Sequence, residues 1–369
     1  MLKRPDQELA IRPAKTGDVA QMAALAEGKS SAAFIRNVLH RKSACVLVAA
    51  AGKRIQGYAV VLFRPATSVA RIHSVVADPE LRSRHVTDAL VRTAEEEARR
   101  RSAIFLRIEI GAEACQSSEP YLDLGYRKFR GYLDYYDRAG SVTRLEKSLS
   151  IPAPRTKRNV PFYHQTTDFT CGPCALMMTM AGLGSNEPMS RELEFQLWRE
   201  ATSIYLISAP GGCDPIGLAV AARRRGFGCE VYVNQPGPYF TQVRQGAQRL
   251  DVMSEAQRIF ARQAEELKIP VRQHELGIED AKAALTDGAI VISLISTHRM
   301  YGDRTPHWIA VYDHADGYFF AHDPWVGAED LELPIQKAGI AIPVPEFARM
   351  SVWGRCQLKA ALIVRQPRQ

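Results

Sequence analysis

The chain has 369 residues, of which 46% are hydrophobic, and its 48 basic and 40 acidic residues give a formal net charge of +8. This length fits two domains better than one. The basic residues form short clusters without interleaved aromatic residues, which argues against a nucleic-acid-binding protein. The sequence has no apolar run long enough to cross a membrane, and its polar start lacks the core of a signal peptide, so we expect a cytoplasmic protein.

The first predicted domain, residues 1–149, alternates strands with helices, and two strands meet across the Ala51-Gly52 turn. This alternation predicts an α/β domain, a mixed sheet with flanking helices. We expect strands at 9–12, 45–49, 58–63, 70–76, 104–110 and 132–136, and helices at 18–27, 86–101 and 120–124.

Residues 150–159 contain two prolines and no hydrophobic periodicity, so we interpret them as a linker. The second predicted domain, residues 160–369, begins with helices and continues with strands, which indicates an α+β arrangement. Residues 235–273 form a mostly helical insertion. We expect further helices at 192–200, 215–225 and 278–285, and strands at 230–233, 289–295, 307–312, 318–321 and 358–364.

Cys171 stands at the start of a predicted helix that fades at Gly182, and Pro173 falls in its first turn, where proline is well tolerated. A thiol at the amino end of a helix meets free N–H groups and the positive end of the helix dipole. Both favour the thiolate, which is the nucleophilic form of cysteine.

His307 and Asp323 lie in two predicted strands that flank the turn-forming run Ala315-Asp316-Gly317. If the turn centres near Ala315, the two residues are directly opposite each other, with Cβ atoms roughly 4.5–5.5 Å apart. An imidazole and a carboxylate at that spacing can form a hydrogen bond. Asp323 would then orient His307, which would take the proton from Cys171.

Gln165 precedes Cys171 by six residues, so its amide could donate to an oxyanion beside the Cys171 N–H. The order of donor, nucleophile, base and orienting carboxylate suits acyl-transfer chemistry at a thiol.

These motifs, from Gln165 through Cys171-Gly-Pro-Cys-Ala-Leu to His307-Trp-Ile-Ala-Val and Asp323-Pro324, resemble the papain-like cysteine peptidases that trim bacteriocin leaders after a double glycine. The resemblance covers about residues 160–364. It implies that Cys171 is the nucleophile, His307 the base, Asp323 its orienting group and Gln165 the oxyanion donor, acting on a peptide or protein substrate. The family's peptidase is usually fused to a membrane exporter, and this sequence contains no such segment.

Several other interpretations of the cysteines remain open. Cys171 and Cys174 could form a thioredoxin-like redox pair, or the papain-like fold could be catalytically inactive. The same thiol chemistry also serves acyltransferases. A zinc site would need a second ligand pair, and Cys213 and Cys229 are not so spaced, so we expect no metal. With seven cysteines in all, we expect no disulfide framework.

The first domain has motifs of another kind, including Ile11-Arg-Pro-Ala, Asp18, the strand 72–76, residues 78–90 and residues 121–126. They resemble the GNAT-type N-acetyltransferases over about residues 9–149. The resemblance implies that backbone N–H groups in a turn before a helix bind the pyrophosphate of acetyl-CoA. The matching cofactor positions are Val76, Arg82, Ser83, Arg84, His85, Val86 and Thr87.

Ser83, His85 and Thr87 stand where the family usually has glycine, which permits close backbone approach. Arg82 and Arg84 could compensate by contacting the phosphates directly. Tyr121 matches the family's general acid, although a packed aromatic residue is an equal interpretation. The domain could therefore acetylate a peptide or amine, or serve as a binding module without catalysis.

Overall fold

The computed structural model describes residues 9–26, 31–79, 84–111, 118–128, 142–152, 154, 156, 158–202, 211–240, 247–325 and 334–367. These residues fall into two compact units, the first ending at Pro154 and the second continuing from Arg155 to Gln369. None of the helices in the described part of the chain combines the length and the apolar composition that a membrane span needs.

The first unit is built on a sheet with the order β1-β2-β3-β4-β5-β7-β6. Neighbouring strands are antiparallel except for β4 and β5, which are parallel. The strands are β1 (Ala10–Pro13), β2 (Ala44–Ala51), β3 (Arg54–Phe63), β4 (Val69–Ala77), β5 (Phe105–Gly111), β6 (Arg127–Lys128) and β7 (Val142–Ser148).

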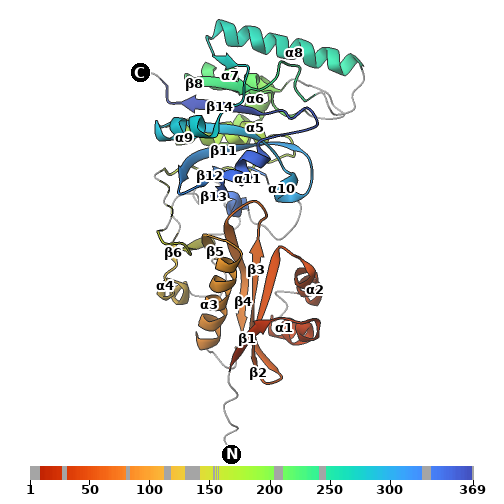
Figure 1. Ribbon diagram of the computed structural model, residues 1–369, viewed down its shortest axis with the longest axis vertical. Coiled ribbons are helices and arrows are strands. Elements are labelled where there is room, and N and C mark those ends of the chain that lie inside the picture. Colours follow the sequence, from red (N-terminus) through yellow and green to blue (C-terminus); the bar gives the residue numbers. More distant parts are fainter. Residues whose placement is uncertain are drawn as a thin grey trace, which may run out of the picture. The chain divides into compact units, whose positions relative to one another are not determined.

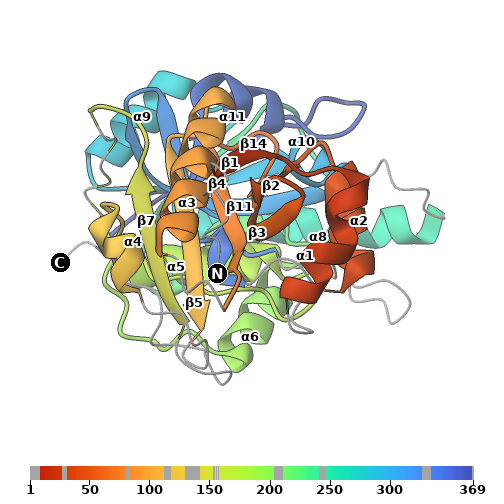
Figure 2. The same ribbon diagram turned by 90° about the horizontal axis from the view of Figure 1, so that it is seen from below.

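Helices cover both faces of this sheet (Figures 1 and 2). Leu47 and Val61 pack in the core under α3, whereas Val48 and Val60 pack in the core under α1 and α2. This division follows the alternation of side chains along a strand, and it explains why the strands are apolar on both faces. The helices are α1 (Val19–Leu25), α2 (Ala32–His40), α3 (Arg84–Arg100) and α4 (Glu119–Asp123).

The predicted mixed α/β sheet with flanking helices is confirmed for this unit. The sequence did not reveal α2 or β7, and the strand expected at 132–136 lies outside the described residues.

The second unit is built on a sheet with the order β13-β12-β11-β10-β14-β8-β9. Its neighbours are antiparallel except for β8 and β9. The strands are β8 (Gly228–Val233), β9 (Val271–Arg272), β10 (Ile290–Ser296), β11 (Pro306–Ala315), β12 (Tyr318–His322), β13 (Ile340–Pro343) and β14 (Ala360–Arg365).

Helix α5 lies against β10 and β11, with α6 and α7 beside it and α8 packed on α7 (Figure 1). Residues 171–180 of α5 are all buried, in keeping with a helix that is apolar on every side. The helices are α5 (Cys171–Gly182), α6 (Arg191–Ala201), α7 (Pro215–Arg224), α8 (Ala247–Glu266), α9 (Ile278–Thr286), α10 (His298–Tyr301) and α11 (Val344–Met350).

The hairpin of β11 and β12 differs from the predicted register. Ala315 pairs with Tyr318, so the turn is Asp316-Gly317, whose φ angles of 49° and 84° suit a tight two-residue turn. A register shift between Val311 and Asp313 then brings Ala310 opposite His322, the last residue of β12. The prediction that His307 and Asp323 are directly opposite in the ladder is therefore wrong.

Candidate active site

His307 on β11 and Asp323, one residue past β12, nevertheless form a hydrogen bond. The Nε2 atom of His307 lies 2.7 Å from Oδ1 of Asp323, and the two side chains are 2% and 0% exposed. The Trp325 N–H also donates to Oδ1, at 2.9 Å, and the Tyr301 hydroxyl donates to Oδ2. Donors on both oxygens fix the carboxylate, which in turn fixes the imidazole.

The electrostatics of this pair favour its charged form. Burial alone would raise the pKa of Asp323, but the charge and hydrogen bond of His307, with Lys337 and Tyr301, hold the pKa well below its usual range. Burial would lower the pKa of His307, but Asp323 and a hydrogen bond with Cys171 outweigh it and raise the pKa. Because Nε2 of His307 is hydrogen-bonded to Asp323, Nδ1 is the ring nitrogen that remains for the Cys171 thiol.

Cys171 is the first residue of α5 and is 6% exposed, as its sequence position predicts for the helix start. Close packing brings this end of α5 onto β11. A Cβ atom added at Gly172 would lie 3.0 Å from the Cys213 side chain and 3.2 Å from that of Trp308, which directly follows His307. The absence of a side chain at Gly172 therefore allows the thiol and the imidazole to approach.

Gln165 is joined to the segment that carries Asp323. Its N–H donates to the Pro324 carbonyl at 2.9 Å, and its side chain is almost fully buried. The Nε2 atom donates to the Thr167 carbonyl at 2.8 Å, which uses one of its two hydrogens. The second hydrogen is available to another acceptor. The structure therefore brings Gln165, Asp323, His307 and Cys171 into one region of the second unit.

Glu194 on α6 is a residue that the sequence analysis missed. Its side chain is fully buried and accepts hydrogen bonds from the Tyr163 hydroxyl at 3.1 Å, the Thr166 N–H at 2.8 Å and the Thr170 hydroxyl. These partners lie on both sides of Gln165 and directly before Cys171. Glu194 therefore holds the Gln165 segment against the start of α5. The one available signal was its place on the buried side of α6 with Leu197.

Other cysteines also lie in the interior of the second unit. Cys174 and Cys213 are fully buried, and burial raises the pKa of both thiols well above the usual range. All six cysteines in the described part are free thiols. Among the described residues, no group of three His, Cys, Asp or Glu side chains is placed to hold a metal ion.

In the first unit, Tyr121 lies on α4 in the core beneath α3. It is 2% exposed, its ring is 6.0 Å from that of Tyr126 in an edge-on arrangement, and burial raises its pKa to about 12. These contacts are those of a packed aromatic residue.

The predicted cofactor positions lie where β4 ends and α3 begins. Val76 is half-buried on β4, and on α3 Val86 is buried, Thr87 half-buried and His85 exposed. Arg84, the first residue of α3, has a 58% exposed side chain that contacts Asp123 and, at 3.7 Å, Asp88. Arg82 and Ser83 lie outside the described residues.

Comparison with known protein families matches both units. Residues 160–365 match the Peptidase_C39 like family, and residues 18–124 match the Acetyltransferase (GNAT) family. No curated protein matches the chain.

Several solved structures of N-acetyltransferases are similar to part of this chain. Ard1 from Thermoplasma volcanium is 18% identical, with 38% of this chain and 97% of that chain covered and a TM-score of 0.33. Ribosomal-protein-alanine N-acetyltransferase from Brucella melitensis is 21% identical, with 38% and 99% covered and a TM-score of 0.33. PaiA N-acetyltransferase from Thermoplasma acidophilum, in complex with coenzyme A, is 15% identical, with 38% and 99% covered and a TM-score of 0.32.

Proposed function

Because the chain belongs to the Peptidase_C39 like family and carries a GNAT acetyltransferase domain before it, we propose that its second domain is a cysteine peptidase. One observation carries the proposal. His307 and Asp323 are buried and form a hydrogen bond of 2.7 Å. The second ring nitrogen of His307 remains for Cys171 at the start of α5. A base oriented by a carboxylate and set beside a thiol is the arrangement that activates a nucleophile.

In the proposed reaction, His307 holds the proton of the Cys171 thiol as an imidazolium, and the sulfur attacks the carbonyl carbon of a peptide bond. The Cys171 N–H and the second hydrogen of Gln165 Nε2 donate to the oxyanion. When the C–N bond breaks, His307 returns its proton to the leaving amine and a thioester forms. His307 then takes a proton from water, which attacks the thioester. The C–S bond breaks, a free carboxylate is released, and the Cys171 sulfur is left beside the protonated His307, ready for the next cycle.

The test offers peptide libraries and an electrophilic thiol probe to the full chain. Cleavage and labelling at Cys171 are expected in the wild type and absent in Cys171→Ala. Cys356→Ala, which removes an exposed thiol, is the control and should retain both. Cleavage that persists without Cys171 would contradict the proposal. Mass spectrometry of the products separates hydrolysis, which leaves a free carboxylate, from thiol acyl transfer, which leaves an acylated amine.

For the GNAT domain we propose that it binds acetyl-CoA and acetylates the amine of a peptide. The residues present fit the cofactor's pyrophosphate, because α3 presents its first-turn N–H groups and the exposed guanidinium of Arg84 after β4. Acetyl-CoA would supply the acetyl group as a thioester. Arg84 and the backbone at His85 and Val86 would hold its phosphates.

Calorimetry of the full chain with acetyl-CoA tests this assignment. Binding together with acetyl transfer to an amine supports it. Binding without transfer leaves a binding module, and an absence of binding removes the cofactor from the proposal.

A further inference from the structure

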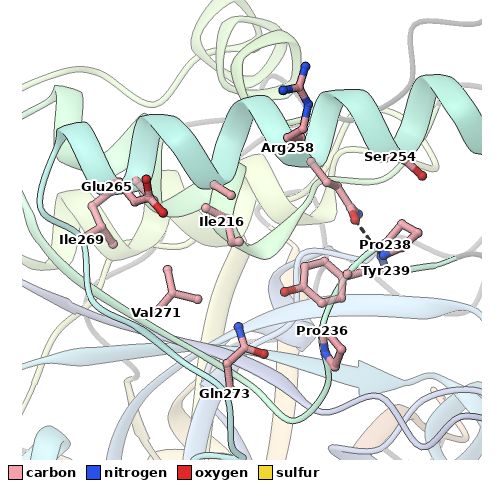
Figure 3. Close-up of a pocket in the computed structure, with 14 residues that line it drawn as sticks. Ile216, Pro236, Pro238, Tyr239, Ser254, Arg258, Glu265, Ile269, Val271 and Gln273 are labelled. Atoms are coloured by element: carbon pink, nitrogen blue, oxygen red, sulfur yellow. Dashed lines mark hydrogen bonds between the residues drawn. The ribbon is translucent and has the colours of Figure 1, made fainter.

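A pocket of about 660 Å³ lies on the second unit between α8 and the segments 236–239 and 269–273 (Figure 3). This volume is in the range of binding pockets and far exceeds what one water molecule fills. Apolar groups dominate its walls, among them Ile216, Pro236, Tyr239, Ile269 and Val271. None of these residues belongs to the proposed catalytic set.

Gln257 holds two walls of the pocket together through its hydrogen bonds. Gln257 on α8 is 7% exposed and accepts a hydrogen bond from the Tyr239 N–H at 2.8 Å. Its amide also lies beside the buried carboxylate of Asp214, where burial raises the pKa of Asp214 and the hydrogen bond with Gln257 opposes that rise. Gln257 thus connects α8 to Tyr239 and to the start of α7, which fixes the walls of the pocket relative to one another.

One wall of the pocket is an open sheet edge. Strand β9 is the last strand of its sheet. The Pro270 carbonyl accepts from the Val231 N–H at 2.9 Å, so in this parallel pair the backbone N–H and C=O of Val271 point away from β8. Within the part of the chain that the structure describes, no hydrogen bond to these two groups is present. The Val271 side chain meanwhile faces the pocket.

The pocket also shares a chain segment with the candidate active site. Asp214 caps α7 by accepting from the Ile216 N–H at 2.8 Å, and Ile216 lines the pocket. Cys213, the residue before Asp214, accepts a hydrogen bond from Trp308 Nε1 at 3.2 Å through its backbone carbonyl. Trp308 directly follows His307 in the sequence. Residues 213–216 thus separate the pocket from the side of α5 that carries Cys171.

From these observations we infer that the pocket binds an extended segment of the peptide substrate, away from the bond that is cut. The segment adds along Val271 as a strand and places alternate apolar side chains between Ile216, Ile269 and Tyr239. The open edge favours a polypeptide over a compact small molecule, because it presents main-chain groups that only another strand pairs fully. This inference rests on the proposed peptidase function.

The test measures fluorescence anisotropy of two labelled octapeptides with the full chain carrying Cys171→Ala, so that no turnover occurs. One peptide is Leu-Ser-Val-Ser-Leu-Ser-Val-Ser, and the other replaces each Leu and Val by Asn. The apolar peptide is expected to bind at least tenfold more tightly. Ala261→Trp, which fills the pocket from α8, should abolish this difference, and Arg262→Trp, one residue along the same helix but outside the pocket, should retain it.

Gln273→Trp narrows the pocket from the opposite wall and replaces Ala261→Trp if circular dichroism shows that variant to be unfolded. Equal binding of the two peptides, or a preference that survives both pocket substitutions, would overturn the inference. The proposed peptidase fails separately, through cleavage that does not depend on Cys171. On a cleaved peptide, Ala261→Trp should raise KM and leave kcat unchanged, whereas a change in kcat alone would contradict a binding role.

Discussion

The Nε2 atom of His307 lies 2.7 Å from Oδ1 of Asp323 although the two residues are not paired in the β11–β12 ladder. The contact is made because the chain turns after His322, and the Trp325 N–H and Tyr301 hydroxyl hold the carboxylate in place. The pair is therefore fixed by its surroundings and does not depend on strand register alone. Its orientation leaves one imidazole nitrogen for Cys171.

Asp323→Asn keeps an acceptor for His307 but removes the charge, so it isolates the electrostatic part of the pair. The folded pKa of His307 is raised, so its stabilisation is present below about pH 6.5 and lost as pH rises through the folded value. The folded pKa of Asp323 is lowered, so its stabilisation is present above about pH 4 and lost as pH falls through the folded value. We expect the loss in Tm to be greatest between about pH 4 and 6.5.

Thermal unfolding of the wild type and Asp323→Asn across pH 3–10, in increments of about one unit, measures this window. A difference in Tm that stays constant with pH would contradict the charged pair.

Gln165→Ala is expected to lower kcat by about 10²–10³-fold, because one oxyanion donor is worth roughly that factor in other hydrolases. Labelling of Cys171 by an electrophilic probe should be nearly unchanged, since this reaction has no carbonyl oxyanion to stabilise. Parallel kinetics of peptide cleavage and probe labelling measure the two effects. Equal losses in both would mean that Gln165 acts on the thiol or on the fold instead.

Glu194→Gln is expected to destabilise the protein by about 2–4 kcal/mol, since hydrogen bonds to a buried carboxylate are worth about 1.5–3 kcal/mol each and an amide accepts at only one atom. It should also lower the rate of peptide cleavage, because Glu194 accepts hydrogen bonds from residues on both sides of Gln165 and so positions Gln165. Urea unfolding measures the stability. Glu192→Gln, on the exposed side of the same helix, is the control and should change neither quantity. A similar loss in both variants would contradict the positioning role.

The position of Cys171 at the start of a helix could be predicted from the local sequence, whereas the role of Glu194 could not. A cysteine before an apolar run with proline in the first turn is a local signal, and α5 begins there. A glutamate in the first turn of a helix normally faces water and favours the dipole, so the place of Glu194 on the same side of α6 as Leu197 was the one local sign of its burial. Its environment is created by the 163–170 segment packing on α6, which is a tertiary event.

The hairpin is an intermediate case. The Asp316-Gly317 turn was within the predicted run, but its centre and the shift near Tyr312 depend on backbone angles and packing that composition does not specify. The pocket beside α8 was beyond prediction for the same reason. The helical content of residues 235–273 is visible in the sequence, whereas the space between α8 and β9 arises only when both pack around Ile216.

Gly172→Ala is expected to reduce cleavage although alanine favours helices. The new methyl group would lie 3.0–3.3 Å from the side chains of Cys213, Trp308 and Leu218, and overpacking of this kind costs about 1–3 kcal/mol. Displacement of α5 from β11 would separate Cys171 from His307. Gly212→Ala, where an added methyl group has nothing within 4 Å, is the matched control. The rate of thiol labelling and kcat should fall only in Gly172→Ala, and unchanged rates would show that the neighbours adjust.

Asp123→Asn and Arg84→Ala are expected to change acetyl-CoA binding in opposite directions. Asp123 now engages the guanidinium of Arg84, so a cofactor phosphate must compete with this carboxylate. Removing the charge at Asp123 should tighten binding by about threefold or more, and removing Arg84 should weaken it by about tenfold, as expected for the loss of a charge-assisted hydrogen bond to a phosphate. Calorimetry at two salt concentrations measures both, because a phosphate contact weakens as salt rises. Arg100→Ala, at the far end of α3 and bonded to Glu97, should bind as the wild type does. If Asp123→Asn bound no better than the wild type, Arg84 would belong to the surface ion pair alone.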